Sequence, residues 1–305
     1  MILLAAEHFV RAPQWTWWIL AYFFFAGLCG GSYALATILR WVGDPKDEPA
    51  VRVGYYVSLV TVAICPLLLT ADLAASWTKF WHMLVNVTPG GGGLNFKYWS
   101  PMSVGAWALL VFGFFAAVSA LDAYLMDRRG KGLLPASLAR VFAVVGTVFA
   151  LFVASYTGVL LSVSNQPVWS DTWALGGLFL ASGLSGSAAL MILLTRYRAG
   201  IEFSIPALAR ADGYFTALEI LLLVLFFITL IAAGTVGRTL PMVVLWVVAL
   251  AGMGASLYAM QRQGRLQVAG AAPAVAAARS ETLLIPLLVL VGVLALRAAV
   301  IFSAQ

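Results

Sequence analysis

The sequence predicts an all-α integral membrane protein with eight transmembrane helices. Of its 305 residues, 63% are hydrophobic and only 10% are charged, and the mean hydropathy is +0.97. Eight apolar runs each reach the roughly 20 residues that a helical span requires. Because these runs are continuously apolar and do not alternate with polar residues, they exclude a transmembrane β-barrel.

The predicted spans leave no room for a separate soluble domain. We expect a single membrane domain over residues 1–305, whose helices group as two four-helix bundles. Gly27 and Gly31 form a small-xxx-small pair in the first span, which predicts close approach of another helix. A long loop, Gln261 to Ser280, is expected between the last two spans. The eight spans are approximately 15–41, 53–76, 102–126, 137–163, 173–195, 208–233, 241–260 and 282–303.

Basic residues lie unevenly between the two sides of the predicted membrane domain. The loops after the first, third, fifth and seventh spans hold most of the 18 lysines and arginines, and the positive-inside rule places these loops in the cytoplasm. Both termini should then be extracytoplasmic, in a multi-pass protein of the inner (cytoplasmic) membrane. The net charge of +6 therefore indicates contact with a lipid bilayer and not with nucleic acid.

The segment from Thr70 to Trp107 is predicted to be the working face on the outer side. Asp72 closes an otherwise apolar run, where a charge is costly and usually has a task or a partner. Pro66 lies one to two turns earlier and is expected to loosen that helix. The alternative is that Asp72 only caps the helix or reaches the interface.

After Asp72 the chain is expected to form an interfacial helix and a glycine-rich turn. Aromatic side chains at helical spacing should share one side of that helix, with Lys79 and His82 on the wetter side. Gly90 to Gly93 allow the chain to turn before the third span. The excess of tryptophans on this side indicates a membrane aromatic belt, with or without a docking surface. The candidate docking residues are Trp77, Lys79, Phe80, Trp81, Lys97 and Trp99.

Two further groups of polar residues lie within predicted spans. Ser155, Tyr156 and Thr157 bring three hydroxyls to the outer third of the fourth span, although a lone buried tyrosine is usually only a satisfied core residue. Asp212 and Glu219 are seven residues apart in the sixth span and therefore share a helix face. We expect this pair to form a cytoplasmic proton half-path. The alternative is a neutral, hydrogen-bonded Glu219 and an Asp212 that reaches the helix end.

The residue inventory restricts the redox chemistry. Only two histidines, His8 and His82, are present, and both lie outside the spans, so haem b is not expected. Cys29 and Cys65 both fall mid-span, which argues against an iron–sulfur cluster and favours packing roles. No metal-ligand spacing, P-loop or dinucleotide signature occurs. Any electrons handled here must pass from outside to a membrane-soluble carrier.

Five short motifs, in this order along the chain, resemble those of the NrfD/PsrC family of eight-span, quinone-reactive subunits of polysulfide reductase-like complexes. They are Ala71-Asp72-Leu73, Phe80-Trp81, Ser100-Pro101-Met102-Ser103, Tyr156-Thr157-Gly158, and Gly292 with Arg297. The resemblance implies a cofactor-free anchor that exchanges electrons and protons between a quinone, menaquinone or ubiquinone, and an extracytoplasmic iron–sulfur (ferredoxin-like) subunit. It also implies a molybdopterin-containing catalytic subunit bound to that partner.

The same resemblance suggests a quinone site near the outer face, among the first four spans. Tyr156 would donate a hydrogen bond to a quinone carbonyl, and Asp72 would exchange protons. The chain departs from the family where some members have Asn and His in the first span, because alignment of the glycines places Ile19 and Tyr22 there. The alternative function is a transporter or a passive anchor. The expected quinone-binding residues are Trp18, Tyr22, Asp72, His82, Ser155 and Tyr156.

Overall fold

The computed structural model describes residue 11 and residues 13–197, 200–268 and 278–305. Within these ranges, eight helices are long and apolar enough to cross a membrane, which confirms the predicted all-α, multi-pass class. The helices are α1 (Trp17–Val42), α2 (Glu48–Asp72), α3 (Pro101–Arg129), α4 (Ala136–Ser162), α5 (Leu175–Leu193), α6 (Ile205–Ala233), α7 (Val243–Val268) and α8 (Ala278–Phe302).

Local sequence signals explain several helix ends. The Thr16 hydroxyl accepts a hydrogen bond from the Trp18 backbone N–H and so caps α1. α3 begins with Ser100 as its cap and Pro101 as its first residue, where a missing N–H costs nothing. Gly130 directly follows α3 and Gly234 directly follows α6, both with positive φ, which an amino acid with a side chain rarely adopts.

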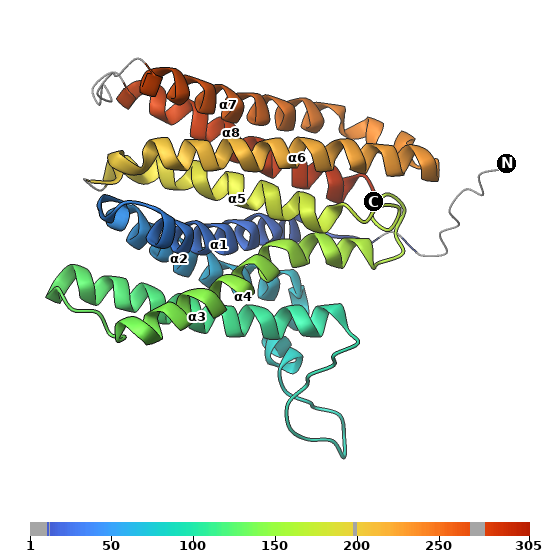
Figure 1. Cartoon of the computed structure of the whole chain (residues 1–305). Coiled ribbons are helices and arrows are strands. Elements are labelled where there is room, and N and C mark those ends of the chain that lie inside the picture. The colour runs from blue at the N-terminus through green and yellow to red at the C-terminus, as the bar shows by residue number, and fades with distance from the viewer. Residues whose placement is uncertain (1–10, 12, 198–199, 269–277) are drawn as a thin grey trace.

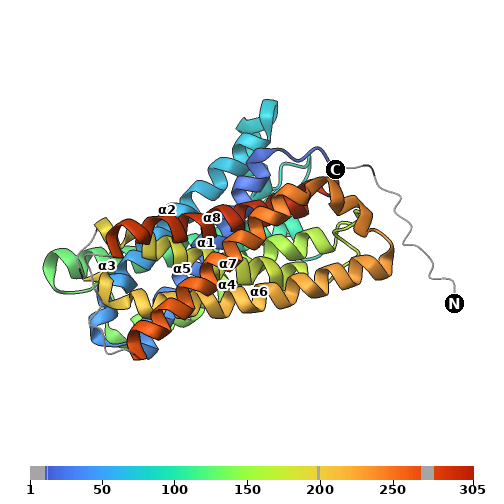
Figure 2. The same ribbon diagram turned by 90° about the horizontal axis from the view of Figure 1, so that it is seen from above.

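α1 and α5 form the centre of the helix assembly. α1 packs against α2, α4 and α5, while α5 also packs against α4, α6 and α8 (Figures 1 and 2). Helices α1 to α4 and helices α5 to α8 each make a closed ring of contacts, and α1 and α5 join the rings over an extensive interface. Because of this shared interface, the division into two four-helix bundles stays a prediction.

Small residues allow the central helices to approach closely, as the first span predicts. A side chain at Gly31 would collide with the Ser187 hydroxyl and the Gly183 carbonyl of α5. A side chain at Gly183 would in turn press on the backbone of Gly27. Gly31 of α1 therefore serves the packing of α1 on α5, and Gly27 lies at the same interface.

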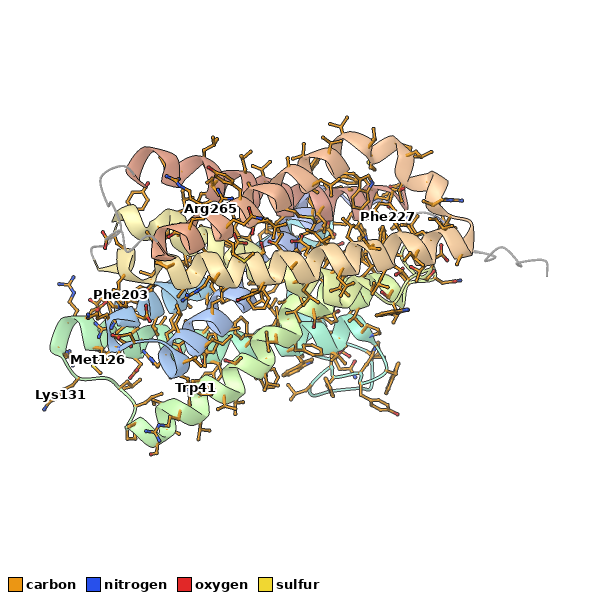
Figure 3. All side chains as sticks on the ribbon, turned by 45° about the horizontal axis from the view of Figure 1, so that its top comes forward. Trp41, Met126, Lys131, Phe203, Phe227 and Arg265 are labelled. Atoms are coloured by element: carbon orange, nitrogen blue, oxygen red, sulfur yellow. The ribbon has the colours of Figure 1, made fainter. Side chains whose placement is uncertain are left out.

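The two ends of the helix assembly differ in composition. We call the end where α1, α3, α5 and α7 begin the tryptophan-rich end, and Figure 1 shows the hairpin loop before α3 and the C-terminus there. The opposite end is the basic end, where Figure 3 shows Lys131 and Phe203. At the basic end, Arg52 on α2 pairs with Glu48 at 3.2 Å and with Asp127 of α3. Arg40 of α1 joins Glu48 at 3.0 Å, which ties three helices together.

Three sequence-based expectations need correction. α2 ends at Asp72, four residues before the predicted end. The following segment, Ala74–Met83, is a 3₁₀ helix, so the side-chain positions expected from α-helical spacing do not hold. α7 continues as helix to Val268, well into the expected loop.

Candidate functional site

Asp72 lies at the tryptophan-rich end, beside the start of α1. It is half-buried, and its carboxylate accepts a hydrogen bond from the Thr16 hydroxyl at 3.3 Å. Thr16 also caps α1, so one side chain joins the end of α2 to the beginning of α1. This position leaves Asp72 partly exposed at the tryptophan-rich end, next to the α1–α2 interface.

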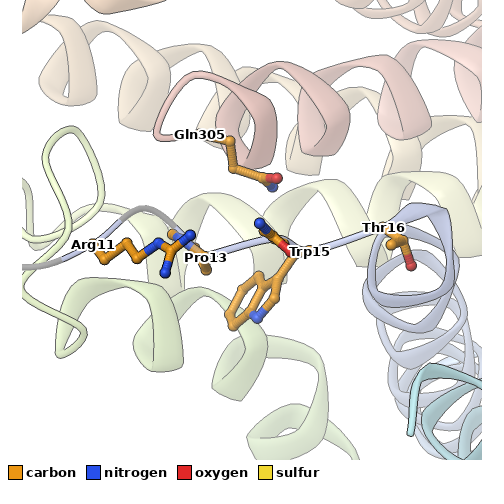
Figure 4. A pocket seen from close by; sticks show the side chains of 6 residues that line it. Arg11, Pro13, Trp15, Thr16 and Gln305 are labelled. Atoms are coloured by element: carbon orange, nitrogen blue, oxygen red, sulfur yellow. The ribbon is translucent and has the colours of Figure 1, made fainter. Parts of the chain in front are cut away.

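The segment before α1 lies against the residues that precede α5 and against the end of α8, at the tryptophan-rich end. The Trp15 ring stacks on Trp169 at 4.9 Å, and the Trp169 indole N–H donates to the Val300 carbonyl of α8 at 2.8 Å. The Gln166 amide donates to the Arg11 carbonyl at 2.9 Å. An open cavity of about 450 Å³ adjoins this segment (Figure 4). It is lined by Arg11, Pro13, Gln14, Trp15, Thr16 and Gln305.

Tyr156 is buried between α4 and α3, and its hydroxyl already has a partner. It donates to the Pro101 backbone carbonyl at 2.6 Å, at the first residue of α3. The phenol ring lies over Gly105, where any side chain would collide with it, and stacks on Phe152 at 5.7 Å. To accept a hydrogen bond from Tyr156, a quinone carbonyl must replace the Pro101 carbonyl as the acceptor or share the hydroxyl proton with it.

Tyr22 of α1 is a predicted site residue that lies near Tyr156 of α4 and Cys65 of α2. It is buried, with 5% of its surface exposed. None of the hydrogen bonds among the described residues involves its hydroxyl. Trp18 lies one turn farther out on α1, and half of its surface is exposed. Tyr22 and Tyr156 thus form a pair of phenols between α1, α2 and α4.

Two other predicted quinone residues point elsewhere. His82 packs edge-on against the neighbouring Trp81 ring at 4.3 Å, in the 3₁₀ segment at the surface. The Ser155 hydroxyl donates to the Phe152 carbonyl one turn earlier in its own helix. No hydrogen bond between described residues joins Asp72 to Tyr156. The geometry therefore groups Tyr22 with Tyr156, and it places Asp72 separately at the end of α2.

The predicted docking residues are all exposed at the tryptophan-rich end. The 3₁₀ helix leads into a loop that pairs Val85 with Leu94 in an antiparallel bridge. The four glycines form the tip of this loop, with positive φ at Gly90 and Gly93. The exposed side chains are Trp77, Lys79, Phe80, Trp81, Lys97 and Trp99.

A second polar site lies in the membrane interior between α5, α6 and α7. The carboxylate of Asp212, only 2% exposed, accepts a hydrogen bond from the Ser185 hydroxyl at 2.6 Å. Thr216, one turn along α6, lies 3.2 Å from Ser185 and donates to Ser256 of α7 at 2.8 Å. Asp212 therefore does not reach out to water at the helix end, because it is enclosed by hydroxyl groups from three helices.

Glu219 and Arg297 continue this site toward the tryptophan-rich end. Glu219 is 3% exposed, and Arg297 of α8 is fully buried. The Arg297 guanidinium donates to the carbonyls of Phe23 at 2.5 Å and Phe179 at 2.9 Å, and to the Ser182 hydroxyl at 3.0 Å. Arg297 was not predicted as a site residue. The available signal was a lone arginine in an apolar span, where charges are rare.

Comparison with known proteins identifies the family. Residues 6–305 match the family described as "Polysulphide reductase, NrfD". The chain belongs to the NrfD family. It is 29% identical over 192 residues to the C subunit of polysulfide reductase from Wolinella succinogenes, an alignment that covers 59% of this chain and 57% of the relative. It is 26% identical over 214 residues to protein NrfD of Escherichia coli, covering 64% of this chain and 63% of the relative.

The matches to these two curated relatives span roughly three fifths of each relative's length. Membership in the NrfD family and the eight apolar helices together establish a multi-pass membrane protein. Within the described residues, no group of three or more histidine, cysteine or acidic side chains is placed to hold a metal ion.

Proposed function

We propose that this NrfD family member is the membrane subunit of a respiratory oxidoreductase complex. It binds quinone or quinol near the extracytoplasmic face and exchanges electrons with an iron–sulfur subunit. The observation that carries this proposal is the family match over nearly the whole chain, together with two phenols, Tyr22 and Tyr156, in the same region near the tryptophan-rich end. The protein is catalytic only within its complex.

The residues between α1, α2 and α4 suit a quinone. Such a ligand needs apolar walls and a few placed hydrogen-bond donors for its carbonyl oxygens. The Tyr22 hydroxyl has no hydrogen-bond partner among the described residues, and Tyr156 offers a second hydroxyl held by the Pro101 carbonyl. The buried Thr157 hydroxyl, next to Tyr156, likewise has no partner in the part of the chain that the structure describes. Asp72, within reach of outside water, would take up or supply the protons.

The exposed surface of residues 74–99 would dock the iron–sulfur partner. Exposed aromatic side chains such as Trp77 and Phe80 are typical of interface anchors. Lys79 and Lys97 add positive charge around them, which favours an acidic partner surface. We expect a molybdopterin-type subunit to bind that partner from farther out.

Proton exchange would also involve the basic end of the helix assembly. If the basic end faces the cytoplasm, Asp212 and Glu219 form a half-path that leads inward from there. Their separation of seven residues corresponds to about 10 Å along the helix axis. The protein would lie in the inner membrane with both termini outside.

Quinol turnover by the purified complex tests the proposed function. Quinol-dependent reduction should be lost in the double variant Tyr22→Phe and Tyr156→Phe, while the complex still assembles, because only two hydroxyls are removed. Normal turnover in this variant would reject the quinone site and favour a passive anchor. Substrate uptake by the isolated protein in vesicles, independent of any partner, would indicate a transporter.

A further inference from the structure

The three charged groups of the membrane interior do not balance when all of them are ionised. Asp212, Glu219 and Arg297 are each at most 3% exposed, and together they carry one net negative charge. An uncompensated charge in the membrane interior is very costly. One bound proton makes the three side chains neutral as a set. The surroundings of the two carboxyl groups then determine which of them carries that proton.

Hydrogen bonds distinguish the two carboxyl groups. The Ser185 hydroxyl donates to Asp212 at 2.6 Å, and such a donor stabilises an ionised carboxylate. The Thr216 hydroxyl lies 3.5 Å from the same oxygen, but it donates to Ser256. None of the described hydrogen bonds reaches the Glu219 carboxyl. Glu219 instead borders a crevice that is too narrow for a water molecule, between α7 and α8. The neutral form therefore belongs to Glu219.

Arg297 is fixed near Glu219 without forming a direct ion pair with it. Its two terminal nitrogens are held by the carbonyls of Phe23 and Phe179 and by Ser182, whereas its Nε has no hydrogen-bond partner among the described residues. A side chain at Gly27 would collide with the guanidinium, so this glycine leaves space for it. Glu219 interacts electrostatically with Arg297 and with Asp212.

The positions of the charged side chains can be followed along α5. Ser182 binds Arg297, and Ser185, one turn nearer the basic end, binds Asp212. The other polar or titratable groups that face these three residues are Ser256 on α7 and Cys29 on α1. Arg297 is thus the only positive charge that the described residues place close to Glu219.

We propose that Glu219 is a proton-carrying residue of the membrane interior and that Arg297 is the positioning residue that stabilises its ionised form. Asp212 remains ionised and forms the end of the site nearer the basic end. Release of the proton from Glu219 leaves a carboxylate facing the guanidinium, and rebinding restores the neutral acid. The assigned protonation states do not depend on the proposed function. Only the claim that quinone turnover drives the proton exchange rests on it.

Infrared spectroscopy of the purified complex in lipid tests the assignment without turnover. A protonated carboxyl group absorbs separately from ionised ones and shifts in heavy water. This band should shift when glutamate, but not aspartate, carries carbon-13 in its carboxyl group, and it should be lost in Glu219→Gln. A shift with labelled aspartate would place the proton on Asp212. Glu202→Gln, at the partly exposed basic end, is the matched control and should keep the band. A band that persists in Glu219→Gln would overturn the assignment, even if quinol turnover is intact. If the parent complex and its variants show the expected bands but the parent complex has no quinol turnover, only the proposed function is rejected.

Two substitutions separate the charge of Arg297 from its packing. In Arg297→Gln the band of protonated Glu219 should persist to higher pH than in the parent protein. Ionised Glu219 then has no positive charge beside it. Arg297→Lys should restore the parent behaviour, and Ser182→Ala should lower stability without moving the pH dependence. If Ser182→Ala changes the pH dependence as much as Arg297→Gln does, packing and not charge controls Glu219. The positioning role would then be rejected.

Discussion

Replacing Tyr156 by phenylalanine tests the predicted quinone site with a minimal change. The substitution removes the 2.6 Å hydrogen bond to the Pro101 carbonyl and leaves the ring packed on Phe152 and Gly105. One buried hydrogen bond contributes about 0.5–1.5 kcal/mol, so the complex should stay folded with a slightly lower unfolding temperature. If the hydroxyl also binds a quinone carbonyl, a loss of about 1 kcal/mol predicts roughly fivefold weaker quinol binding.

Tyr33 provides a matched control for this substitution. Its hydroxyl is also buried and is 2.8 Å from the Ser119 hydroxyl and 3.1 Å from the Phe142 carbonyl. It lies about 16 Å from Tyr22 along α1 at 1.5 Å per residue. Tyr33→Phe should therefore lower stability without changing the quinol concentration that gives half-maximal turnover. Identical quinol kinetics in the parent and both variants would refute the role of Tyr156.

Three further predictions concern the tryptophan-rich end. Asp72→Asn should slow quinol turnover more than it reduces assembly, measured as rate per assembled complex, and an unchanged rate would remove Asp72 from the site. Photo-cross-linkers at Lys79, Phe80 and Lys97 should capture a subunit that contains iron–sulfur clusters. Capture of that subunit only from loops at the basic end would contradict the docking surface. Reporter tags at both termini should read as extracytoplasmic, and a cytoplasmic tag after Gln305 would reverse the proposed orientation.

The helix assembly could be predicted because membrane insertion depends on local composition. Eight apolar runs became eight helices, mostly with ends within a few residues of the expected ones. The same-face placement of Asp212 and Glu219 also follows from helical periodicity alone, and both side chains are buried. These features need no knowledge of how distant helices meet.

The contacts of the candidate sites depend on which helices meet, and one sequence does not reveal this. The partner of Tyr156 is a backbone carbonyl on α3, and the partners of Arg297 are carbonyls on α1 and α5. Carbonyl groups occur at every residue, so no side-chain pattern indicates them. The 3₁₀ form of Ala74–Met83 was also not predicted. Its 10 residues contain no proline or glycine that would mark a departure from an α-helix.

α1 connects the two candidate sites through consecutive residues. Tyr22 faces α2 and α4, where it lies near Tyr156, whereas the backbone of Phe23 receives a hydrogen bond from Arg297 of α8. A small movement of α1 would therefore change the surroundings of both phenols and of the guanidinium that stabilises ionised Glu219. Such a movement needs space, and the glycine contacts between α1 and α5 leave very little. Coupling between the sites, if turnover produces it, must then act through the charge on Arg297 and its carbonyl partners more than through helix displacement.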